Sequence, residues 1–208
     1  ARVVAAHSQD PNYLALFAPG EDIHTNIALQ IFGSAEFRQD AKALGHGANY
    51  GMGENRMIRD GHDPKKVKAF FKGRAQNFPR LIEWTDEVRE IGESGQLLDN
   101  GFGRPLKVER SRAYTQAPAQ VGQSGTRDMM AESALDLVHA MPEVLTMFRG
   151  IVHDEFVFSV PEKDAKEIGQ EIVKVIQREW APPGKSIPVP VISDVSKPGK
   201  NWADCYGK

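Results

Sequence analysis

Apolar residues recur three and four positions apart over most of the first half of the chain. This spacing places side chains on one face of a helix. Asp22 precedes the first such run as a capping residue, and Gly33 follows it as a stop signal. Pro64 and Pro79 suit the first helical position of two later runs. The pattern predicts helices over residues 22–32, 36–50, 64–75, 79–91, 126–140 and 162–180.

Short β-prone runs bounded by turn residues occur later in the chain. Residues 96–108 predict a hairpin with Gly101 and Gly103 at its turn. Residues 150–158 form two apolar runs around a polar centre, which predicts a second hairpin. Prolines restrict residues 187–195 to an edge strand or an extended tail. The expected fold class is therefore α+β, mostly helical with a small antiparallel sheet.

Length and composition are those of a globular protein. The 208 residues are 40% hydrophobic and 26% charged, which allows one or two domains with a sizeable core. No apolar run has membrane-spanning length and no secretory signal is visible, so we expect no membrane partner. Cys205 is the single cysteine, which excludes an internal disulfide framework and fits a reducing compartment.

The net charge of −2 argues against a uniformly basic nucleic-acid binder, but the charge is unevenly distributed. Residues 38–80 hold ten Lys or Arg and four Asp or Glu, whereas the remainder holds sixteen and twenty-four. A basic lobe beside an acidic remainder suits an enzyme that grips polyphosphate in one place and metal in another. An uneven solvated surface is the alternative.

The second hairpin has Asp154 and Glu155 between its apolar runs. Burying bare carboxylates is costly, so this pair must be solvated, paired or bound to a metal. Acids at the tip of a hairpin would present hard oxygen ligands to Mg²⁺. An ordinary surface turn is the alternative.

Arg38, Lys42, His46 and Tyr50 recur every four residues, which makes one stripe on a helix. The two cations can hold a polyphosphate, the guanidinium as a fork and the ammonium as a point charge. The two rings could stack on a base and sugar. Glycines beside His46 weaken the case for an ordinary solvated helix face and permit close approach of another chain or a ligand.

These segments together resemble the C-terminal part of family A DNA polymerases. The stripe resembles the family's fingers motif, His153-Asp154-Glu155 its C-terminal palm motif, and Asp22-Ile-His24-Thr the segment before the fingers helix. The segment 112–120 resembles the one that contacts primer and template, and residues 199–202 resemble the family's C-terminal end. The motifs stand in the family's order and cover nearly the whole chain.

The resemblance implies template-directed DNA synthesis with two Mg²⁺ ions, for which Mn²⁺ could substitute, and with dNTPs and primer–template DNA as partners. It implies that Asp154 is a metal ligand and catalytic residue, supported by Glu155. Lys42 would bind phosphate and protonate the leaving pyrophosphate. The other implied nucleotide contacts are His24, Arg38, His46 and Tyr50, and the implied primer–template contacts are Arg112, Gln116, Gln120 and His153. His46 departs from the family, which usually has Phe or Tyr there.

The resemblance also divides the chain into a palm segment (1–12), a mostly helical fingers subdomain (13–105) and part of a palm with a small antiparallel sheet (106–208). Residues 1–8 resemble the end of the first palm motif, without its Asp and Glu. We therefore expect activity only with an upstream polypeptide that carries that motif and the thumb.

The expected setting is the cytoplasm of a bacterial or phage-infected cell, with an organelle as a further option. Two other classes of function remain. One is an inactive DNA-binding remnant or replication subunit, and the other is an unrelated Mg²⁺-dependent phosphohydrolase.

Overall fold

The computed structural model describes residues 1–206, so Gly207 and Lys208, which end the predicted palm part (106–208), lie outside the described residues. The chain forms two compact units. Unit 1 comprises Ala1–Gly125 and Trp180–Pro190, and unit 2 comprises Thr126–Glu179 and the residues from Val191 onward. Within residues 1–206, no helix is long and apolar enough to cross a membrane.

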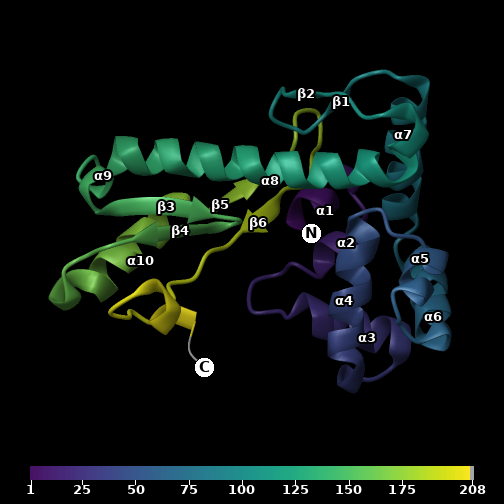
Figure 1. Ribbon diagram of the computed structural model, residues 1–208, viewed down its shortest axis with the longest axis horizontal. Coiled ribbons are helices and arrows are strands. Elements are labelled where there is room, and N and C mark those ends of the chain that lie inside the picture. Colours follow the sequence, from purple (N-terminus) through teal and green to yellow (C-terminus); the bar gives the residue numbers. More distant parts are fainter. Residues whose placement is uncertain (207–208) are drawn as a thin grey trace. The chain divides into compact units, whose positions relative to one another are not determined.

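Unit 1 is mostly helical, as its apolar periodicity predicts (Figure 1). Two short 3₁₀ turns lie in this unit, η1 (Ala35–Phe37) and η2 (Arg110–Arg112). The predicted first hairpin is confirmed as the antiparallel strands β1 (Leu98–Asp99) and β2 (Pro105–Leu106). The helices of unit 1 are α1 (Arg2–Ser8), α2 (Pro11–Ala15), α3 (Ile23–Phe32), α4 (Arg38–Asn49), α5 (Glu54–Arg59), α6 (Pro64–Asn77), α7 (Pro79–Ser94) and the first half of α8 (Ala113–Ala140).

Local capping chemistry fixes several of these helix ends. Asp22 caps α3, and Gly33 ends it at φ 77°. Pro64 is the first residue of α6, and Gly95 ends α7 at φ 80°. The buried Asp10 was not singled out in the sequence; its carboxylate accepts hydrogen bonds from the backbone N–H of Tyr13 at 2.9 Å, Arg80 at 3.0 Å and Leu81 at 3.3 Å. One carboxylate thus satisfies the free N–H groups at the start of both α2 and α7.

Helix α8 begins thirteen residues before the predicted start at Thr126, so that prediction was wrong. Its first part contains Pro118, which is fully buried. Proline cannot bond to the carbonyl four residues before it, here that of Tyr114. Arg89 of α7 replaces the missing donor, because its Nε lies 2.9 Å from the Tyr114 carbonyl oxygen. A contact distant in sequence therefore keeps the proline inside the helix.

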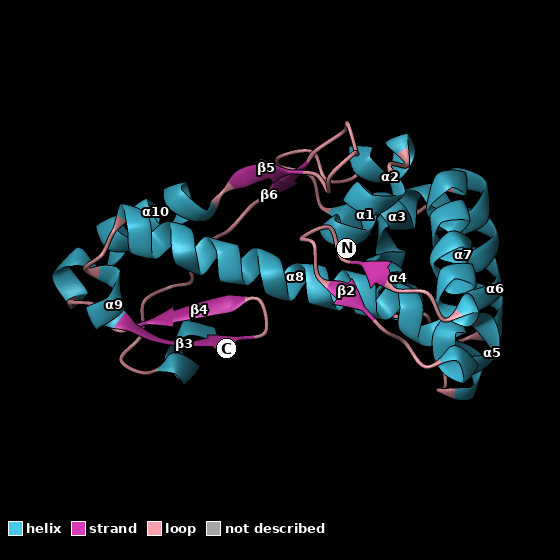
Figure 2. Ribbon diagram, turned by 90° about the horizontal axis from the view of Figure 1, so that it is seen from above, coloured by secondary structure: helices cyan, strands magenta, loops and turns pink. Residues whose placement is uncertain are grey.

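Unit 2 places a hairpin against helices (Figure 2). It contains the second half of α8, α9 (Val144–Met147), β3 (Phe148–Val152), β4 (Glu155–Phe158), η3 (Glu162–Asp164), α10 (Ala165–Ile176) and η4 (Trp202–Tyr206). The strands are antiparallel and pair Ile151 with Phe156 and Val152 with Glu155, which confirms the predicted second hairpin. Phe156 and Phe158 pack on a core of Leu137, Val144, Ile172 and Ile176.

The predicted helix over 162–180 ends at Ile176, which corrects its last four residues. Arg178–Trp180 forms strand β5 instead and pairs with β6 (Val189–Val191), which lies inside the segment predicted to be an edge strand or an extended tail. Trp180 stacks on Phe102 with ring centroids 4.9 Å apart. The predicted fold class, mostly helical α+β with small antiparallel sheets, is confirmed.

Candidate functional site

The four residues of the predicted stripe lie along α4 and at its C-terminal end. Lys42 and His46 are exposed, Arg38 is half-buried, and Tyr50 is 41% exposed. The residues that α4 buries against the rest of unit 1 are Ala41, Leu44, Gly47 and Ala48. Because the buried positions follow one helical face, they force the stripe toward the other face. The stripe that the sequence predicts is therefore present and accessible.

Asp22 holds the first residue of the stripe. Its Oδ2 lies 2.7 Å from an Nη of Arg38, and its Oδ1 accepts from Nε at 3.2 Å. Oδ1 also accepts from the backbone N–H of Thr25 at 2.7 Å, which is the α3 cap. The Arg38 guanidinium and the Thr25 N–H hold the pKa of Asp22 far below its usual range. The sequence marks Asp22 as a helix cap and as part of the segment before the stripe, but it gives no signal for the ion pair with Arg38.

His24 lies half-buried beside the same groups. Its Nδ1 is buried without a hydrogen-bond partner among the described residues. Burial is the main cause that lowers the pKa of His24, and the charges of Lys42, Arg38 and His46 lower it further, while Asp22 acts in the opposite direction. The N-terminus of α3 and the stripe thus form one basic cluster that contains a single carboxylate.

The aromatic end of the stripe packs against other residues of unit 1. The His46 and Tyr50 rings have centroids 4.5 Å apart. A Cβ at Gly47 would come within 2.9 Å of the Met57 side chain, so this glycine accommodates α5. Gly51, at φ 76°, leaves no room for a Cβ beside the Thr115 backbone. The close approach expected at glycines near His46 is therefore made within unit 1, by α5 at Gly47.

Three of the residues expected to contact primer and template lie in η2 and the first turns of α8. Arg112 and Gln116 both meet Glu109: the Arg112 Nε lies 3.4 Å from its carboxylate, and the Gln116 Oε1 accepts from its backbone N–H at 3.2 Å. Gln120 lies one further turn along α8 and is half-buried. Because Thr115 touches Gly51, the structure brings this segment next to the Tyr50 end of the stripe.

The acidic turn, residues 153–155, lies in unit 2. His153 and Asp154 form the two-residue turn between β3 and β4, and His153 adopts the left-handed φ of 55°. The side chains of Asp154 and Glu155 are exposed. Within residues 1–206, no cluster of three or more His, Cys, Asp or Glu could hold a metal ion. Two adjacent carboxylates fit part of a Mg²⁺ coordination shell, which takes hard oxygen ligands and retains water.

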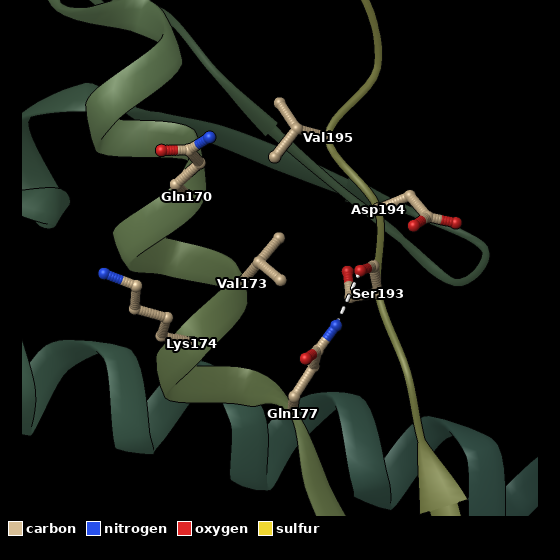
Figure 3. A pocket seen from close by; sticks show the side chains of 7 residues that line it. All are labelled: Gln170, Val173, Lys174, Gln177, Ser193, Asp194 and Val195. Atoms are coloured by element: carbon tan, nitrogen blue, oxygen red, sulfur yellow. Dashed lines mark hydrogen bonds between the residues drawn. The ribbon is translucent and has the colours of Figure 1, made fainter. Parts of the chain in front are cut away.

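A groove of about 360 Å³ in unit 2 lies between α10 and residues 193–195. Gln177 crosses one end and donates from Nε2 to the Ser193 carbonyl oxygen at 2.8 Å (Figure 3). None of the residues predicted to bind nucleotide, metal or DNA lines this groove.

The chain is similar to known DNA polymerases over nearly its full length. It is 29% identical over 219 residues to the thermostable DNA polymerase I of Thermus filiformis, covering 98% of this chain and 26% of that protein. It is 27% identical over 212 residues to the DNA polymerase of Mycobacterium phage D29, covering 99% of this chain and 33% of that protein. The chain thus spans a quarter to a third of the length of these relatives.

The fold is also similar to that of a solved polymerase structure. The POL domain of Pol1 from M. smegmatis, solved in complex with DNA primer-template and dNTP, matches with a TM-score of 0.74 and 19% identity. The match covers 90% of this chain and 36% of that one. The model of the family described as DNA polymerase family A matches residues 1–204. The chain belongs to DNA polymerase family A.

Proposed function

We propose that this chain takes part in template-directed DNA synthesis, the transfer of a nucleotide from a dNTP to a primer 3′ hydroxyl. The observation that carries the proposal is the basic cluster on α3 and α4, which occurs in a chain matched over residues 1–204 by the family model. The cytoplasmic setting expected from the sequence is supported by relatives from bacteria and a phage.

The cluster has the chemistry to bind a triphosphate. Arg38 offers a planar fork for two phosphate oxygens, and Lys42 offers an exposed ammonium one turn along α4. Lys42 can also give a proton to the departing pyrophosphate, where negative charge develops. His24 lies beside these cations, and its buried Nδ1 has no hydrogen-bond partner among the described residues. These three residues would hold the triphosphate.

The rings of His46 and Tyr50 would border the sugar and base of the bound nucleotide. Tyr50 is exposed enough to meet a base pair, and it stands on a chain reversal fixed by Gly51. Arg112, Gln116 and Gln120 would contact primer and template from α8, and His153 would lie near the primer end. Amide side chains suit the minor groove, where the acceptors vary little with sequence.

Asp154 would hold Mg²⁺, with Glu155 as a weaker contributor. When bound, a pair of such ions lowers the pKa of the attacking hydroxyl and stabilises the leaving oxygen. The strand pairing of Val152 with Glu155 fixes the backbone of the turn, and this holds the exposed Asp154 in position. Two carboxylates are too few for two ions, so we propose that further ligands come from a polypeptide that carries the first palm motif.

Nucleotide binding to the 208-residue chain tests the basic cluster directly. We expect Lys42→Ala to weaken binding of a Mg²⁺-free dNTP by about tenfold, a typical loss for one charge-assisted contact. Lys166→Ala is the matched control, since Lys166 is an exposed helical lysine of unit 2. Equal affinities for the two variants would contradict the proposed role of the cluster.

Primer extension tests the completed active site. We expect no extension by the chain alone, and extension when the polypeptide with the first palm motif is added. Robust extension by the chain alone would show that its own residues supply all the metal ligands. DNA binding without extension in the mixture would favour the inactive remnant.

A further inference from the structure

One side of α6 carries a row of exposed lysines. Lys65, Lys68 and Lys72 follow each other at three- and four-residue steps, so they share one face of the helix. At a rise of 1.5 Å per residue, the row is about 10 Å long. The opposite face is buried through Val67, Phe70 and Arg74. We call the three lysines the α6 lysine row.

No acidic side chain lies between the lysines of the row. The exposed residues on this side of α6 are Lys65, Lys68, Ala69, Lys72, Ala75 and Gln76, and residues 64–82 contain no Asp or Glu. Asp63 caps the helix, where its carboxylate accepts from the backbone N–H groups of Lys65 and Lys66. Among residues 1–206, none of the three lysines of the row forms an ion pair with a carboxylate.

Neighbouring cations are arranged differently. Lys66 points to α4, where its Nζ lies 2.8 Å from a carboxylate oxygen of Asp40. Arg56 of α5 pairs with Asp60 at 2.8 Å. An ordinary solvated helix face mixes charges of both signs at four-residue spacing. The α6 lysine row instead repels itself, and a line of negative charge laid along it would relieve that repulsion.

We propose that the α6 lysine row binds the phosphate backbone of the unpaired template strand. The partner rests on the proposed function, because DNA is the polyanion that a family A polymerase handles. The face itself is separate from the basic cluster on α3 and α4. Lysines are point charges without a fork, and no exposed aromatic residue stands among them, so the contact would be with phosphates and independent of base sequence.

The test compares two triple variants of the 208-residue chain. One is Lys65→Ala/Lys68→Ala/Lys72→Ala, which removes the row and keeps helix propensity, because alanine is the strongest helix former. The control is Lys163→Ala/Lys166→Ala/Lys197→Ala, which removes three exposed lysines of unit 2. Circular dichroism checks that both variants are folded. Fluorescence anisotropy then measures affinity for a primed template with a long 5′ overhang and for the same duplex with blunt ends, between about 50 and 200 mM salt.

Each phosphate neutralised on a single strand contributes about 0.7 to the slope of log affinity against log salt. On the overhang substrate, we expect the slope of the row variant to be shallower than that of the unmodified chain by about 2. We expect the slope of the control to change by less than half as much. Equal slopes for the two variants, or no DNA binding by the unmodified chain at about 50 mM salt, would overturn the proposal. An equal loss on blunt duplex would overturn the assignment to the unpaired strand. The effect of Lys42→Ala on binding of Mg²⁺-free dNTP is measured separately and does not depend on the α6 lysine row, so the two proposals can fail independently.

Discussion

Gly51→Ala tests whether the end of α4 needs its close contact with α8. A Cβ at Gly51 would lie 2.8 Å from the Thr115 Cα and would overlap the Thr115 carbonyl oxygen. Backbone atoms cannot swing aside as the end of a side chain can. The left-handed conformation costs a residue with a Cβ about 1–2 kcal/mol, and overpacking costs about 1–3 kcal/mol more. We expect Gly51→Ala to lower the free energy of unfolding of unit 1 by about 2–5 kcal/mol.

Gly33→Ala is the matched control. Gly33 has φ 77°, nearly that of Gly51, but no atom lies within 4 Å of the position that its Cβ would take. This variant loses only the conformational part, about 1–2 kcal/mol. Urea unfolding followed by tryptophan fluorescence measures both losses, because Trp84 is buried in unit 1. Losses that agree within about 0.5 kcal/mol would show that α4 and α8 do not meet closely at Gly51.

Four further predictions concern the candidate site. Asp22→Asn keeps an N-cap residue on α3 but frees Arg38, so it should tighten dNTP binding by about two- to fivefold; weaker binding in a titration would contradict competition between Asp22 and phosphate. A triphosphate should raise the lowered pKa of His24, so binding should take up protons and strengthen as the pH falls toward 6; calorimetry in buffers of different ionisation enthalpy measures this uptake, which His24→Asn should abolish. With the polypeptide that carries the first palm motif present, Asp154→Ala should lower incorporation at least about a hundredfold and leave DNA affinity unchanged; normal incorporation would exclude it as a metal ligand. His46→Tyr should change the ratio of deoxy- to dideoxynucleotide incorporation more than the rate with dNTPs, and an unchanged ratio would place His46 away from the sugar.

Elements whose signals are local were predictable from the sequence. Asp22, Gly33 and Pro64 each act on the backbone within a few residues, so they mark the ends of α3 and α6 correctly. The stripe on α4 was equally predictable, since its four-residue spacing needs only a helix. The acidic turn required only two β-prone runs around a polar pair.

Elements whose boundaries depend on distant contacts were not predictable in this way. The predicted start of α8 was wrong because Arg89 replaces the hydrogen bond that Pro118 cannot make. The predicted end of α10 was wrong because the residues that follow it form strand β5, which pairs with β6. Asp10, fully buried under two helix starts, carries no local signal beyond that of a single cap. In the site, the ion pair of Asp22 with Arg38 joins residues sixteen positions apart.

The acidic turn depends on residues that carry no charge. His153 stands at φ 55°, a conformation that a residue with a Cβ adopts only when its surroundings impose it. Those surroundings are the pairing of Val152 with Glu155 and the packing of Phe156 and Phe158 on the core of unit 2. Because apolar contacts hold both strands, the turn can expose Asp154 to solvent without an ion pair to position it. A carboxylate held in this way is placed by the backbone and stays open to solvent, whereas Arg38, which we propose to bind phosphate, is paired with Asp22 and would first have to leave it.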